Sequence, residues 1–174
     1  LTWTHILPDS GKFDFGNVNH HGYCVDVYAD TLWVGTFQGI NASFDGGNTW
    51  KNFSWPLDGS GKQGDQWPGN WVYTVEHKVV NGKTHIWVGS EREYNTGLGV
   101  YGICHTDDNG ATWQYKTTTY NAWNIAFGHN GTNNPKVSDE TVIAASDSGL
   151  VISYDLGDTW EIIPVRDPGG RAWE

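Results

Sequence analysis

The chain has 174 residues, with 20 acidic residues against 10 Lys and Arg and a formal net charge of −10. This balance argues against nucleic acid or an anionic membrane surface as partner, because both attract basic proteins. No stretch approaches the length of a membrane span. The 23 Gly, the 11 Trp and the absence of Met agree with a secreted module.

Short apolar runs alternate with turn residues along the chain, and no segment carries a sustained helical period. In chain order, the runs predict three groups of four strands. The first group is expected at 23–28, 31–35, 40–44 and 49–53. The second is expected at 71–79, 85–89, 100–106 and 112–116, with an Asn81-Gly82 hairpin turn. The third is expected at 122–127, 141–145, 150–153 and 159–163. The predicted fold class is all-β.

One phrase recurs between the third and fourth strands of each group, with the form Ser/Thr-x-Asp-x-Gly-x-Thr-Trp. Its Asp can accept hydrogen bonds from the turn backbone, and its Gly supplies a positive φ. The Thr-Trp pair is expected to begin the returning strand, with the Trp buried in its own group of strands. These structural residues are Ser43, Asp45, Gly47, Thr49, Trp50, Thr106, Asp108, Gly110, Thr112, Trp113, Ser153, Asp155, Gly157, Thr159 and Trp160.

The phrase resembles the Asp-box (BNR) repeat of sialidases, sortilins, xyloglucanases and photosystem II assembly factors. Three complete copies and a partial one at Leu1-Thr2-Trp3 cover almost the whole chain. The resemblance implies a β-propeller. Trp50, Trp113 and Trp160 recur 63 and 47 residues apart, and repeats with a period of roughly 40–50 residues are typical of propellers or solenoids. The implied units are an outer strand of a preceding blade (1–6), three four-stranded antiparallel blades (7–54, 55–117 and 118–163) and a connection to the next blade (164–174).

Three blades and one outer strand do not close a propeller, which typically has about four to eight blades. We therefore expect an incomplete arc of a larger propeller. The missing blades would come from the same protein or from another chain. An uncovered arc would otherwise expose sheet edges that favour aggregation.

The order of connections in such blades predicts two distinct faces. The boxes lie on one face, and the long links 7–22, 54–70 and 91–99 share the other, which binds ligands in the Asp-box families. Long loops on a rigid scaffold are where function usually sits. The third blade instead has its longest loop, 128–140, on the box face. The candidate ligand-binding residues are Asp14, His20, His21, Trp67, Glu91, Arg92, Glu93 and Tyr94.

The best single cluster among them is Glu91-Arg92-Glu93, where an Arg between two acids offers donors beside acceptors. The alternative is that the segment 91–99 only packs against a neighbouring blade or chain. Neither reading requires a metal ion or a cofactor, and none is predicted.

Two classes of function are compatible with this sequence. The leading one is a noncatalytic extracellular binding or scaffold module, a fragment of a larger secreted or cell-surface protein with a glycan or protein ligand. The alternative is a fragment of a glycoside hydrolase. Sialidase-like catalysis requires three clustered arginines, and the chain has only Arg92, Arg166 and Arg171. Xyloglucanase-like catalysis requires two opposed carboxylates. The acids available for it, none in a motif that we can match, are Asp14, Asp58, Asp65, Glu91 and Glu93.

The cysteines and three of the asparagines are further candidates for chemical modification. Cys24 and Cys104 match no metal motif and are interpreted as free thiols, with a disulfide as the alternative. Asn41, Asn52 and Asn130 begin glycosylation sequons, a pattern that also arises by chance in chains rich in Asn, Ser and Thr.

Overall fold

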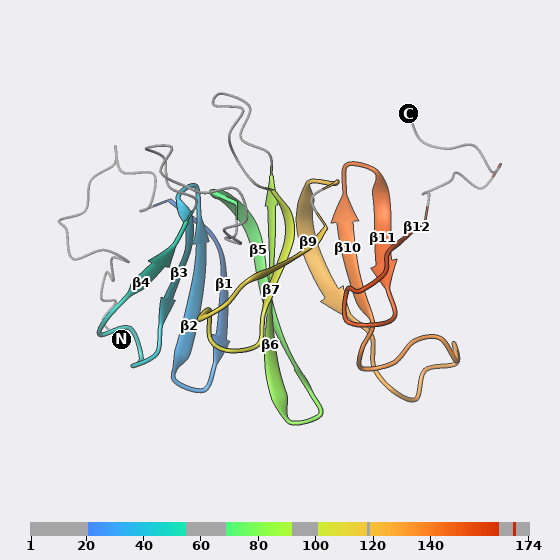
Figure 1. Cartoon of the computed structure of the whole chain (residues 1–174), viewed down its shortest axis with the longest axis horizontal. Helices are drawn as coiled ribbons and strands as arrows, with labels where there is room; N and C mark the ends of the chain where they lie inside the picture. Colours follow the sequence, from blue (N-terminus) through green and yellow to red (C-terminus); the bar gives the residue numbers. More distant parts are fainter. Residues whose placement is uncertain (1–20, 55–68, 92–100, 118, 164–168, 170–174) are drawn as a thin grey trace.

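The computed structural model describes residues 21–54, 69–91, 101–117, 119–163 and 169. These residues form three four-stranded antiparallel sheets and contain no helix, which confirms the all-β class (Figure 1). No helix in the described part is long and apolar enough to cross a membrane. The predicted strand at 1–6 and nearly all of the predicted connection at 164–174 lie outside the described residues.

Each sheet is built from four consecutive strands, so neighbours in sequence are also neighbours in the sheet. The first sheet comprises β1 (Gly22–Tyr28), β2 (Thr31–Thr36), β3 (Gly39–Ser43) and β4 (Lys51–Phe53). The second comprises β5 (Trp71–Val80), β6 (Lys83–Glu91), β7 (Gly102–Thr106) and β8 (Gln114–Thr117). The third comprises β9 (Ala122–Phe127), β10 (Val142–Ser146), β11 (Gly149–Ser153) and β12 (Glu161–Ile163).

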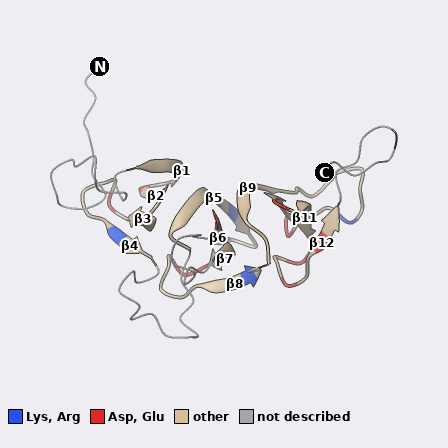
Figure 2. Cartoon of the chain, turned by 90° about the horizontal axis from the view of Figure 1, so that it is seen from above, with Lys and Arg blue, Asp and Glu red and all other residues tan. Residues whose placement is uncertain are grey.

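The three sheets stand side by side, with their first strands β1, β5 and β9 adjacent along one edge of the molecule (Figure 2). Because every sheet has the same strand order, the connections between third and fourth strands share one end, which we call the box end. The first strands begin at the opposite end, where the second strands also finish. We call this second end the loop end.

Each box turn is held by the same set of hydrogen bonds. The Ser43 hydroxyl donates to Asp45 Oδ1 at 2.8 Å, and Asp45 accepts from the Thr49 backbone N–H at 2.8 Å and from the Thr49 hydroxyl at 2.7 Å. The second and third turns repeat these bonds around Asp108 and Asp155. The carboxylate therefore caps the turn, as its chemistry predicts.

The fourth strand begins later than predicted in every sheet. Residues 49, 112 and 159 were expected to start it, whereas β4, β8 and β12 start at Lys51, Gln114 and Glu161. The reason is the cap itself, because the backbone N–H of the box Thr is bonded to the Asp carboxylate instead of to a neighbouring strand.

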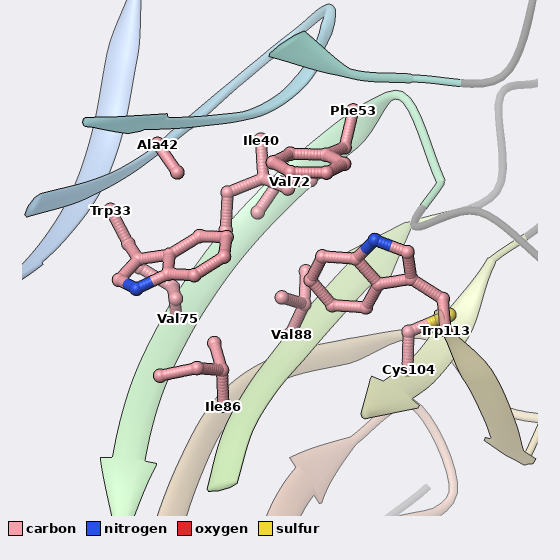
Figure 3. Packing of buried hydrophobic residues seen from close by; sticks show 10 residues of the cluster. All are labelled: Trp33, Ile40, Ala42, Phe53, Val72, Val75, Ile86, Val88, Cys104 and Trp113. Carbon is pink, nitrogen blue, oxygen red and sulfur yellow. The ribbon is translucent and has the colours of Figure 1, made fainter. Parts of the chain in front are cut away.

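Trp113 and Trp160 lie at the junction between their own sheet and the preceding one. Trp113 is 5% exposed, and its ring meets Trp33 and Phe53 of the first sheet at centroid distances of 6.1 and 5.6 Å (Figure 3). Trp160 packs against a cluster that joins Trp87 of the second sheet to Val142 and Val151 of its own, and it stays half-buried, as does Trp50. Trp113 is therefore buried as predicted, between its own sheet and the first, whereas Trp50 and Trp160 are only half-buried.

The box glycines also touch the preceding sheet. Gly110 has a φ of +76°, and a Cβ there would lie 2.6 Å from Cζ of Phe53. Gly157 has a φ of +80°, and a Cβ there would lie 2.8 Å from Cη2 of Trp87. Glycine is thus required twice, by the left-handed backbone and by the ring beneath it.

The two cysteines are free thiols, as predicted. Among the sequons, Asn41 is fully buried, and its Oδ1 accepts a hydrogen bond from Asn52 Nδ2 at 2.9 Å. Asn41 is therefore inaccessible to glycosylation in the folded protein.

The glycine contact predicts different outcomes for two substitutions in equivalent turns. Gly110→Ala should lower the free energy of unfolding by about 1–3 kcal/mol, the usual cost of forcing an extra carbon into a packed site. Gly46→Asn should change it by less than about 0.5 kcal/mol, since a Cβ added at Gly46 would meet nothing within 4 Å and Asn109 holds the same turn position at a φ of 57°. Urea unfolding monitored by Trp fluorescence measures both, and equal losses would contradict the packing account.

The caps also predict a loss of stability in acid. Hydrogen bonds to Thr49 hold the pKa of Asp45 at about 2, and the pKa values of Asp108 and Asp155 are likewise about 2. Because these folded-state values are depressed, the stabilisation is present above about pH 4 and is lost as the pH falls towards 2. Replacing all three by Asn should lower stability at neutral pH and flatten its decline between pH 4 and 2. Urea midpoints across this range test it, and an unchanged pH slope would contradict it.

Candidate binding face at the loop end

Two of the eight candidate ligand-binding residues lie in the described part of the chain. His21 is exposed immediately before β1, and Glu91 is half-buried at the end of β6. Both therefore lie at the loop end, where the sequence places the ligand face. The remaining candidates fall outside the described residues: Asp14, His20, Trp67, Arg92, Glu93 and Tyr94.

Four aromatic side chains from two sheets gather at this end, centred on Phe37 in the turn between β2 and β3. The Phe37 ring stacks on Tyr23 at 4.1 Å and on Trp71 at 5.2 Å, with interplanar angles of 21° and 26°. Tyr73 meets Phe37 edge-on at 6.0 Å and lies 5.5 Å from Tyr23. We call these four residues the aromatic cluster.

Two members of the cluster occupy equivalent positions in their sheets. Tyr23 lies at a register shift between Gly22 and Cys24, and Tyr73 lies at one between Val72 and Thr74. Such β-bulges re-aim a side chain and are frequent beside functional sites.

The third sheet has the same irregularity at Trp123, between residues paired with Ser146 and Ala145. Tyr23 and Trp123 are 44% and 42% exposed, unusually high for large aromatic side chains at the start of a strand. Each sheet thus presents one bulge aromatic at the loop end. The alternation of apolar and polar residues does not predict these bulges, although each first strand has an aromatic residue near its start.

A carboxylate accompanies the aromatic cluster. Partial burial, together with a hydrogen bond to Glu91 and its negative charge, raises the pKa of Tyr73 to about 12. At neutral pH the Tyr73 hydroxyl is therefore protonated and acts as a donor to the Glu91 carboxylate. This is the only role that the described structure gives to a member of the predicted Glu91-Arg92-Glu93 cluster.

The arrangement suits recognition of a sugar ring. Aromatic faces carry partial negative charge and attract the weakly positive C–H groups of a pyranose, while hydroxyl groups can bond to Tyr73 and Glu91. The alternative is a structural role, in which the rings pack at the junction between the first and second sheets. Both roles agree with Phe37 at the centre of the stack and Tyr23 at its exposed edge.

A second group of polar residues lies further along the same first strands. Asp26 of β1 bonds His77 of β5, with 2.6 Å between Oδ2 and Nδ1. Burial and the nearby Asp26 charge raise the pKa of Glu76. A carboxyl group with a raised pKa beside a second carboxylate is typical of general acids, although structural ion pairs also perturb pKa values.

No protein-family model matches the chain, and a search of curated proteins finds no match. Function is therefore inferred from the residues of the site itself, since one fold can carry many activities.

Proposed function

We propose that the chain is an incomplete arc of an Asp-box β-propeller. It would serve as a noncatalytic binding or scaffold module within a larger secreted or cell-surface protein, with its loop end binding a glycan or a protein. The observation that carries the proposal is the repeated contact through which the second and third box turns pack on the preceding sheet. Gly110 meets Phe53 in this way, and Gly157 meets Trp87.

The two flanks of the arc support its continuation. By register, Val25, Val75 and Ile125 are equivalent, each opposite the middle of the second strand. Val75 and Ile125 are 1% and 3% exposed beneath a preceding sheet, whereas Val25 is 64% exposed. An apolar residue at this level of exposure is what a further sheet would cover.

The opposite flank has the same property. Trp33 and Trp87 are fully buried beneath the following sheet, while Ile143, at the equivalent position in β10, is half-buried. Ile162 and Ile163 of β12 are 47% and 42% exposed. Further sheets, from the same protein or another chain, would bury both flanks and remove the open edges.

A glycan is the ligand class that the loop end fits best. The aromatic cluster offers ring faces, and the Tyr73–Glu91 pair offers hydroxyl and carboxylate groups beside them. The net charge of −10 favours neutral or basic glycans over acidic ones. An extracellular location would bring such a module into contact with them.

Binding of the intact protein to an array of neutral oligosaccharides tests this assignment. Tyr23→Ala should weaken binding of a captured glycan by about 10-fold or more, as expected for removal of a stacked ring. The matched control is Tyr154→Ala, which removes a tyrosine from the third box turn at the opposite end and should leave affinity unchanged. Equal affinity in wild type and Tyr23→Ala, with both folded, would remove the aromatic cluster as the glycan site.

The alternative remains a glycoside hydrolase fragment, and the raised pKa of Glu76 beside Asp26 is the observation that favours it. Glu76→Gln removes a proton donor with little change in volume. Under the binding-module proposal, the intact protein does not hydrolyse the glycans that it binds, and Glu76→Gln binds them equally well. Product release by wild type that Glu76→Gln abolishes, measured by reducing-sugar assay, would instead establish the enzyme.

A further inference from the structure

Two histidines and an aspartate of the second sheet meet at the box end, far from the aromatic cluster along the strands. His85 lies in β6, His105 in β7, and Asp107 in the box turn that follows. His85 Nδ1 and His105 Nε2 are 2.8 Å apart, and one ligand atom from each of the three residues lies within 4.8 Å of the others. The histidines are 8% and 5% exposed, and Asp107 is half-buried.

The repeat itself does not require this group. The pairings of Ile86 with Thr106, Leu32 with Ser43 and Val142 with Ser153 align the three sheets. The positions of His85, His105 and Asp107 are then filled in the first sheet by Thr31, Ala42 and Phe44, and in the third by Thr141, Ile152 and Tyr154. The other two sheets therefore make the same turn without any imidazole.

Hydrogen bonding within the pair leaves one buried atom unexplained. One of the two facing nitrogens must carry the proton, and the far nitrogen of His105, Nδ1, is buried with no hydrogen-bond partner. A buried polar atom without a partner in a native structure calls for an explanation such as a water or an ion. Nδ1 lies on the far side of the ring from His85, so an ion between the facing nitrogens would not bind it; the case for an ion rests on the facing nitrogens and the nearby carboxylate.

The chemistry of the three groups matches a metal site. When each ring carries its proton on the far nitrogen, both facing nitrogens offer a lone pair to an ion between them. Two nitrogens bound at right angles to one ion at roughly 2.0–2.1 Å would lie about 2.9 Å apart. Imidazole nitrogens in such positions, with a carboxylate nearby, suit late divalent transition metals and not Mg²⁺ or Ca²⁺.

We propose that His85, His105 and Asp107 form a binding site for a divalent late transition-metal ion, with Cu²⁺ the best fit and Ni²⁺ or Zn²⁺ weaker alternatives. The facing nitrogens of the two histidines supply two ligands, and the carboxylate supplies a third. The Asp107 carboxylate accepts a hydrogen bond from Lys83 Nζ at 2.7 Å. The ion would displace this ammonium group, which is exposed. Lys116, whose positive charge also lies near the two histidines, donates to Asp158 at 3.0 Å.

The site lies between the second and third sheets. The His105 ring packs on Trp87 at 4.6 Å, and Trp87 is the residue that the box glycine Gly157 of the third sheet contacts. A bound ion would therefore link β6, β7 and the box turn of the second sheet beside its junction with the third, without requiring the glycan site at the loop end.

The test is titration of the metal-free intact protein with Cu²⁺, followed by calorimetry and by electron paramagnetic resonance. Wild type should bind one equivalent at this site with hyperfine coupling to two imidazole nitrogens, and its thermal midpoint should rise. His85→Thr, which installs the residue of both other sheets, should weaken binding by about 10-fold or more and remove one nitrogen coupling. Mg²⁺ should give neither signal.

Two further variants keep the proposal falsifiable if His85→Thr folds poorly. Asp107→Asn changes only a partly exposed carboxylate and should also lower Cu²⁺ affinity. His77→Gln is the matched control, since His77 is a half-buried histidine paired with Asp26 in another part of the molecule. The same Cu²⁺ affinity and spectrum in wild type and Asp107→Asn, or loss of the two-nitrogen signal in His77→Gln, would overturn the assignment.

Discussion

The contact of the second and third box turns with an aromatic ring of the preceding sheet sets the spacing of the three described sheets. Gly110 rests on Phe53, and Gly157 rests on Trp87. Trp113 lies beside the Phe53 ring (Figure 3). The Asp cap fixes the conformation of the turn. The Gly and the Trp of that turn then cover the apolar face of the preceding sheet. One local hydrogen-bond pattern therefore propagates into the packing of successive sheets.

Different polar contacts link the first sheet to the second and the second sheet to the third. At the first junction, Asp26 bonds His77. At the second, Lys78 of β5 reaches the third sheet, donating to the Gly128 carbonyl at 3.0 Å and to Asp139 at 3.1 Å. The long 128–140 loop, predicted on the box side, is thus tied to the neighbouring sheet. Such partner-specific pairs favour one order of sheets over another, a specificity that apolar burial alone does not provide.

The sequence predicts local structure well and contacts between sheets poorly. Alternation and turn chemistry were enough to locate the strands and the Asp caps, because both depend on residues close together in the chain. The direction of Trp113, the bulge at Tyr73 and the meeting of His85 with Asp107 depend on register and on a neighbouring strand or sheet. Of the predicted binding face, only His21 and Glu91 can be placed, and the aromatic cluster around Phe37 emerged from the fold.

The two ends of the molecule carry different constraints. At the box end, every turn needs its Asp, its Gly and its packing ring, so a change there alters stability before it alters anything else. At the loop end, the bulges at Tyr23, Tyr73 and Trp123 aim side chains outward without taking part in a cap. Residues there can vary while the scaffold persists. The metal-site residues are an exception within the constrained end, since Asp107 occupies a box position where Phe44 and Tyr154 show that the turn accepts different side chains.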